Sequence, residues 1–121
     1  MNTKHLFVIT ALCAVIALAS VGCGSQPASE TVNLTLRAHD IGFDVARFEA
    51  KANQTVQLTY INDGVIDHAF AINGLVKEQK VKPGQSLTFT FTPQTAGAFK
   101  YFCAVAGHEA AGMVGTLIAA P

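Results

Sequence analysis

The chain carries little charge and no tryptophan. Only 13% of its 121 residues are charged, and 8 lysines and arginines balance 8 aspartates and glutamates, so the formal net charge is zero. A balanced chain lacks the basic excess with which proteins bind nucleic acid, and no nucleic-acid partner is expected. Half of the residues are apolar, which excludes wholesale disorder, and the length is that of about one domain.

Long hydrophobic runs are also scarce, and the one that exists lies at the N-terminus. Residues 6–19 form a mostly apolar stretch after Lys4 and His5. This is the length of a signal-peptide core and is short for a membrane-spanning helix. We therefore expect residues 1–22 to be a signal peptide, with an uncleaved anchor as the alternative.

The residues that follow this stretch suggest how the chain is processed. Ser20 to Cys23 resembles a bacterial lipobox, in which the cysteine is lipidated and becomes the new N-terminus, so Cys23 is the predicted lipidation site. Ser20 stands where leucine is usual, which leaves ordinary cleavage at residues 17–19 open. The first route predicts an exported lipoprotein that faces the periplasm or the cell exterior, and the second a soluble periplasmic protein. Residues 23–31 are small and polar, as in a flexible tether, so the folded domain is expected at 32–121.

Disulfides are excluded by the same division of the chain. Of the three cysteines, Cys13 lies in the predicted signal peptide and Cys23 is the predicted lipidation site, which leaves Cys103 alone in the folded domain. A free thiol in an oxidising compartment is prone to oxidation unless it is buried or bound to a metal. A buried small apolar residue and a metal ligand are therefore the two interpretations of Cys103.

The folded part shows apolar residues at every second position, separated by turn residues such as Asn73-Gly74 and Pro83-Gly84. No long amphipathic helix stands out, although residues 43–50 and 78–81 have room for a turn or two of helix. The pattern predicts an all-β fold, an antiparallel β-sandwich of about seven or eight short strands. The clearest alternating runs are Val32, Leu34, Leu36; Val56, Leu58, Tyr60; and Leu87, Phe89, Phe91.

Three residues near the C-terminus form the most informative pattern. Cys103, His108 and Met113 recur at five-residue intervals in a segment rich in glycine and alanine. A thiolate, an imidazole and a thioether are ligands for a copper ion that cycles between the +1 and +2 states, and such sites take a second histidine. His68 is favoured because it opens an apolar run, whereas His39 lies in a polar stretch and is expected to be an ordinary surface histidine.

The order of these residues resembles that of the small blue copper proteins, the cupredoxins, over residues 32–119. A first histidine follows a strand and a turn, and a Cys-x-His-x-Met loop with two four-residue spacers comes later. Residues 97–103 and 112–117 are similar to the two strands that flank this loop in the family. The resemblance implies a Greek-key sandwich with one copper ion, with His68, Cys103 and His108 in a trigonal plane and Met113 as a long axial contact.

One position departs from the family pattern. Many members have asparagine or serine after the first histidine, where the side chain and backbone connect the two ligand loops and hydrogen-bond near the sulfur. This chain has Ala69. We therefore expect weaker support around the metal than in those members.

The residues around Cys103 separate the copper functions. A binuclear centre needs a second cysteine before His108, and residues 104–107 contain none. Oxidases and nitrite reductases with several coppers place a histidine beside the cysteine, whereas here the neighbours are Phe102 and Ala104. The sequence therefore predicts a protein that is not an enzyme.

The resemblance implies an electron carrier that docks transiently, as a monomer, with redox-partner proteins. The edge of His108 would be the electron port, and the near-neutral charge favours apolar docking. The alternative is a copper storage, delivery or sensing lipoprotein, and a domain with a vacant site is a third interpretation. The expected docking patch around His108 comprises Ala104, Val105, Ala106, Ala110, Ala111 and Gly112.

Overall fold

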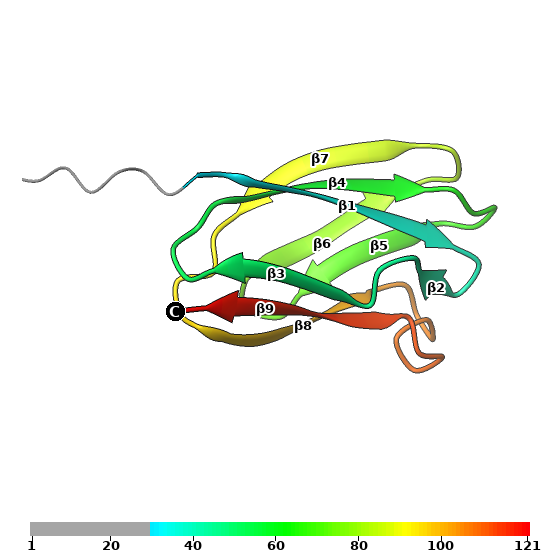
Figure 1. The fold of residues 1–121 in the computed structure, drawn as a ribbon. Coiled ribbons are helices and arrows are strands. Elements are labelled where there is room, and N and C mark those ends of the chain that lie inside the picture. Colours follow the sequence, from blue (N-terminus) through cyan, green and yellow to red (C-terminus); the bar gives the residue numbers. More distant parts are fainter. Residues whose placement is uncertain (1–29) are drawn as a thin grey trace, which may run out of the picture.

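A computed structural model describes residues 30–121, in which nine strands form two packed sheets (Figure 1). The predicted signal peptide, Cys13, Cys23 and most of the predicted tether lie outside the described residues. Within residues 30–121 no helix reaches the length and hydropathy needed to span a membrane.

Each sheet draws its strands from distant parts of the chain. The first sheet has the order β2-β1-β4-β7, with β1 at Val32–His39, β2 at Gly42–Phe43, β4 at Val56–Asn62 and β7 at Ser86–Phe91. The second has the order β3-β9-β8-β5-β6, with β3 at Arg47–Lys51, β5 at His68–Ile72, β6 at Val76–Val81, β8 at Gly97–Cys103 and β9 at Val114–Ala120.

The predicted all-β sandwich is confirmed, with three differences of detail. It has nine strands, whereas about seven or eight were predicted. Both sheets are mixed, because β1 pairs with β4 and β3 pairs with β9 in parallel, whereas the sequence pattern predicted antiparallel pairs only. Of the two segments with room for a helical turn, 78–81 lies in β6, and the second half of 43–50 lies in β3. These are edge strands, where pairing with one neighbour outweighs local preference.

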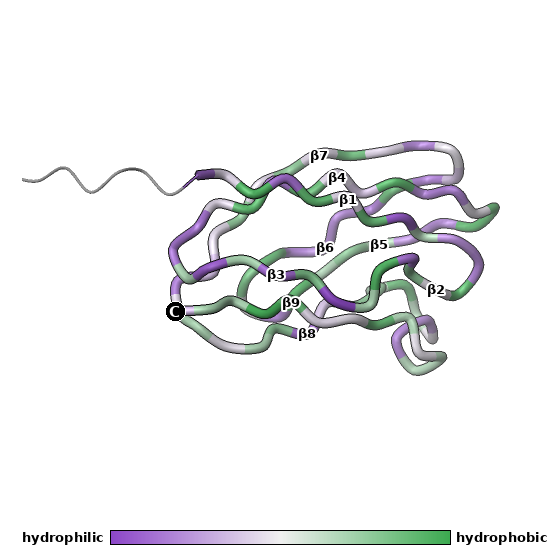
Figure 2. Tube along the Cα trace, viewed as in Figure 1, coloured by the Kyte–Doolittle hydropathy of each residue, from purple (hydrophilic) through white to green (hydrophobic). Residues whose placement is uncertain are grey.

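The core fills the space between the sheets. Inward-facing residues of β4, Val56, Leu58 and Tyr60, are buried and alternate with more polar neighbours, an alternation visible along the strands in Figure 2. An aromatic group lies at the centre, where the ring of Phe70 lies 5.8 Å from that of Tyr60 and 5.6 Å from that of Tyr101. The two sheets are thus held together mainly by apolar contacts.

Three connections meet at the end of the sandwich opposite the C-terminus in Figure 1. They are the β1–β2 turn, the β4–β5 connection at residues 63–67 and the β8–β9 loop at residues 104–113. The amide of Asp63 donates to the carbonyl of Ala38 at 2.9 Å, which joins the first two. Loops on a rigid scaffold commonly carry function, and the predicted ligands lie here.

Candidate metal centre

Two neighbouring strands bring the first two predicted ligands together. His68 is the first residue of β5, and Cys103 is the last residue of β8. These strands are antiparallel neighbours, with Phe70 opposite Cys103. Because side chains alternate along a strand, His68 and Phe70 share the inner face, and His68 extends past the end of β8 toward the thiol.

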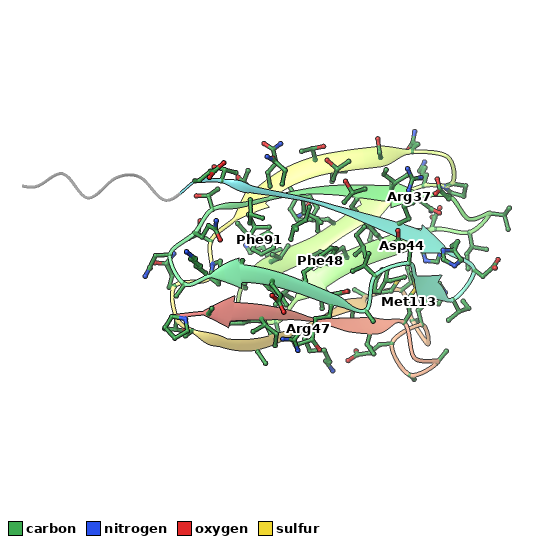
Figure 3. All side chains as sticks on the ribbon, in the orientation of Figure 1. Arg37, Asp44, Arg47, Phe48, Phe91 and Met113 are labelled. Atoms are coloured by element: carbon green, nitrogen blue, oxygen red, sulfur yellow. The ribbon has the colours of Figure 1, made fainter. Side chains whose placement is uncertain are left out.

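Three of the four predicted ligands form one cluster. The Sγ atom of Cys103 lies 3.4 Å from Nδ1 of His108 and 3.8 Å from Nδ1 of His68. The potential ligand atoms of these three residues all lie within 4.8 Å of one another. Met113, the fourth predicted ligand, is fully buried at the same end of the sandwich (Figure 3).

The ligands differ in exposure. His68, Cys103 and Met113 have relative exposures of 0%, whereas His108 is half-buried. Burial lowers the pKa of His68, and the positive charge of His108 lowers it further. A low pKa favours the neutral imidazole, which is the form that binds a metal. Because the other three ligands are fully buried, His108 is the only one of the four through which the site reaches the surface.

Backbone hydrogen bonds connect the two ligand segments. The amide of Ala69 donates to Sγ of Cys103 at 3.4 Å, and the amide of Ala104 donates to the carbonyl of Ala69 at 2.8 Å. The expectation of weaker support at Ala69 therefore applies to its side chain alone, because both backbone links are present. The two hydrogen bonds fix Cys103 and Ala69 relative to each other.

The β8–β9 loop is closed by its own hydrogen bonds. The amide of Cys103 donates to the carbonyl of Met113, and the amide of Met113 donates to the carbonyl of His108, both at 3.0 Å. Gly107 and Gly112 adopt φ of 84° and 97°, a region that side chains with a Cβ rarely enter. The loop thus holds His108 and Met113 at fixed places relative to Cys103.

Most of the other predicted positions in residues 30–121 are exposed. His39 is exposed and belongs to no ligand cluster, as expected. The docking-patch residues share the β8–β9 loop with His108; Ala104 and Val105 are half-buried, and Ala106, Ala110, Ala111 and Gly112 are exposed.

The structure adds residues that the sequence pattern did not single out. Four of the large apolar residues exposed on the surface lie in or beside the three connections, and we call them the apolar rim: Ile41, Val65, Ile66 and Val114. Asn62 was missed as well, because it begins Asn62-Asp63-Gly64, a sequence typical of an ordinary turn. Asn62 and His68 are the fully buried polar residues of the described chain. The burial of the Asn62 amide marks it, and the sequence alone does not show this burial.

The donor set fits a single type 1 copper site. A thiol and two imidazole Nδ1 atoms converge, with a buried thioether on the same loop, and copper sites with one weak axial ligand use this combination. Zinc in proteins takes thiolate, imidazole or carboxylate and seldom a thioether, so Met113 favours copper.

Comparisons with known proteins agree with this donor set. The family described as Cupredoxin-like domain matches residues 8–119. No curated protein matches the chain.

Solved structures with the same fold include auracyanins, one of which is described as a "blue" copper protein. An auracyanin from Roseiflexus castenholzii superposes with a TM-score of 0.68 at 20% identity, covering 74% of this chain and 98% of that one. Auracyanin A, a "blue" copper protein from Chloroflexus aurantiacus, gives 0.65 at 18% identity, covering 74% and 99%. A copper nitrite reductase from Nitrosomonas europaea gives 0.65 at 26% identity, covering 76% of this chain and 42% of that one.

Proposed function

We propose that this chain, which belongs to the cupredoxin-like family, is a mononuclear type 1 copper protein that carries single electrons between redox partners outside the cytoplasm. The observation that carries the proposal is the convergence of one thiol and two imidazole Nδ1 atoms, at 3.4 and 3.8 Å from the sulfur, beside a buried methionine.

The residues themselves explain how such a site suits electron transfer. A bound copper ion supplies a one-electron couple between the +1 and +2 states. Strands β5 and β8 hold His68 and Cys103, and the hydrogen-bonded loop holds His108 and Met113. Three of these side chains are fully buried, which keeps water away from the ligand atoms. A site that rearranges little between oxidation states needs little energy to move its ligands when an electron is transferred.

The surroundings of Cys103 favour a carrier over an enzyme. Its neighbours are Phe102 and Ala104, so no histidine beside the cysteine leads to a second metal. Within residues 30–121, the group His68, Cys103 and His108 is the one cluster of three or more potential histidine, cysteine or carboxylate ligands. The match to the nitrite reductase covers 42% of that chain, so the likeness concerns one part of that enzyme.

The end of the sandwich that carries the partly exposed His108 suits brief apolar docking. The expected patch shares the β8–β9 loop with His108, the apolar rim lies in or beside the three connections at this end, and Val65 is 86% exposed. Electron self-exchange between reduced and oxidised copies of the protein tests this surface without a known partner. Val65→Lys should slow self-exchange about tenfold by like-charge repulsion and leave the visible spectrum unchanged. An unchanged rate would exclude Val65 from the docking surface.

The N-terminal segment supports a location outside the cytoplasm. We propose export and a membrane tether through lipidated Cys23, on the strength of the lipobox-like sequence. In cells, Cys23→Ser should move the protein from the membrane fraction to the soluble fraction. A protein that is soluble with Cys23 intact would favour ordinary signal-peptide cleavage instead.

The central test is the visible spectrum of the purified protein with Cu(II), before and after reduction. An intense thiolate-to-copper band that bleaches on reduction and returns on reoxidation, with copper retained, supports the electron carrier. Cys103→Ser should abolish the band, whereas Met113→Leu should keep copper bound and shift the potential. Loss of copper on reduction would favour a delivery protein, and a band that survives Cys103→Ser would refute the ligand assignment.

A further inference from the structure

We propose that Asn62, the last residue of β4, is a positioning residue that fixes His68 and thereby sets how firmly the site retains copper. The inference rests on the proposed copper site and adds a residue outside the ligand set. Asn62 lies six positions before His68.

The side chain of Asn62 binds three backbone groups, two in the β4–β5 connection and one in β6. Its Nδ2 donates to the carbonyl of Ile66 at 2.8 Å and to the carbonyl of Val81 at 2.9 Å, and its Oδ1 accepts from the amide of Gly64 at 2.9 Å. Both donor hydrogens are therefore used, and the residue is 0% exposed. A buried amide satisfied in this way is costly to remove, because each partner would be left without its hydrogen bond.

The backbone of Asn62 is itself fixed. Its amide donates to the carbonyl of Gln85, and its carbonyl accepts from the amide of Gly84, both at 2.9 Å. Gln85 and Gly84 belong to the β6–β7 turn, so Asn62 is held from outside the connection that it organises. It therefore acts as an anchor for residues 63–67 rather than moving with them.

Two contacts carry this anchoring to His68. Val81, a partner of the Asn62 amide, lies opposite His68 in the β5–β6 pair. Gly64 packs against the imidazole, because a Cβ at that position would lie 3.3 Å from both His68 Nε2 and Asn62 Oδ1. Within residues 30–121 no group hydrogen-bonds to His68 Nε2, so packing against the connection orients the ring.

Ring orientation matters because Nδ1 of His68 must point at the proposed copper position, which it would share as a ligand with Cys103 Sγ. If the connection relaxes, the outer edge of the ring is released and the Nδ1 lone pair turns away from that position. Residues that orient a histidine ligand change metal affinity by about 10–100-fold when they are mutated. We expect an effect of this size from loss of Asn62.

The test compares variants that touch the connection with one that does not. Asn62→Ala removes all three side-chain hydrogen bonds. Gly64→Ala is the milder variant, since its methyl group would be crowded but not blocked. Val56→Ala is the matched control, because Val56 is fully buried at the opposite end of the same strand and its truncation lowers stability without touching the site.

The measurements are the visible spectrum with Cu(II) and the rate at which a strong Cu(I) chelator removes copper from the reduced protein. Asn62→Ala should lose Cu(I) about 10–100-fold faster than the unmodified protein and show an altered spectrum. Gly64→Ala should change both in the same direction, and it decides the matter if Asn62→Ala does not fold. Val56→Ala should lower Tm and change neither.

The outcomes separate this inference from the proposed function. If the unmodified protein shows no thiolate-to-copper band, the copper site itself fails. If the band is present but Asn62→Ala and Gly64→Ala keep the original spectrum and copper-loss rate, Asn62 has only a structural role. An equal change in Val56→Ala would also overturn the inference, because the effect would then follow from stability alone.

Discussion

Two buried tyrosines with opposite hydrogen-bonding states allow a sharp test of the core. Tyr60 and Tyr101 are both 0% exposed, and both rings contact Phe43 and Phe70. The hydroxyl of Tyr101 donates to the carbonyl of Val45. The hydroxyl of Tyr60 has no partner within the described part of the chain. Replacing each by phenylalanine removes one oxygen and leaves the ring in place.

The two substitutions should have opposite signs. A buried polar group without a partner costs about 1–3 kcal/mol, so Tyr60→Phe should stabilise the protein by about 1 kcal/mol. Tyr101→Phe loses a hydrogen bond and leaves the Val45 carbonyl without its donor, which should cost about 1–2 kcal/mol. The gap of about 2–3 kcal/mol corresponds to roughly 8–24 °C in Tm, at about 4–8 °C per kcal/mol for a domain of this size.

The assay is thermal unfolding of the metal-free proteins followed by circular dichroism. The visible spectrum after addition of copper serves as the control, because neither tyrosine is a proposed ligand and both variants should keep it. Equal destabilisation by the two substitutions would refute the reasoning. A larger loss in Tyr60→Phe than in Tyr101→Phe would do so as well.

Two further predictions concern the same region. Gly115→Ala should destabilise the protein by about 1–3 kcal/mol or more in thermal unfolding, because its Cβ would lie under 3.0 Å from three atoms of the Tyr101 side chain. The loss of stability should be smaller in a Tyr101→Ala background, and an equal loss there would contradict the clash. Burial raises the pKa of Tyr101 to about 12 and also raises the pKa of Tyr60, from ordinary values near 10. The unfolded chain therefore loses these protons at lower pH than the folded protein does. The free energy of unfolding should be unaffected by the two phenols below about pH 10 and should fall as the pH rises toward 12, with phenolate absorbance rising together with unfolding. Ionisation of both phenols while the fold persists would contradict this.

The sequence predicted the parts of the fold that depend on period and left open the parts that depend on pairing. Alternation in Val56–Asn62 and Ser86–Phe91 identifies β4 and β7, since one face of each strand is apolar. The parallel pairs β1–β4 and β3–β9 could not be predicted, because the alternation of residues along a strand does not show which strand pairs with it. Strand β6, with the sequence VKEQKV, has residues common in helices, and its pairing with β5 decides its state.

The site shows the same division between side-chain identity and position. Cys103, His108 and Met113 could be predicted because their chemistry is unusual and their spacing is regular. The role that we propose for Asn62 could not, because it depends on three backbone partners that meet only in the folded chain. A buried amide among turn residues has no distinctive sequence pattern.

Ala69 shows why a departure from a family pattern need not remove the interaction with which it is associated. A side chain at this position can be lost, but the amide that donates to Cys103 Sγ is present in any residue other than proline. Its place is set by the register in which Phe70 lies opposite Cys103, and the carbonyl of Ala69 binds the amide of Ala104 through the same alignment. A shift of register by one residue would turn His68 to the other face of the sheet and break both links at once. Support for the metal site therefore depends on the pairing of β5 with β8, and the packing that fixes this register contributes to the site as directly as the ligands do.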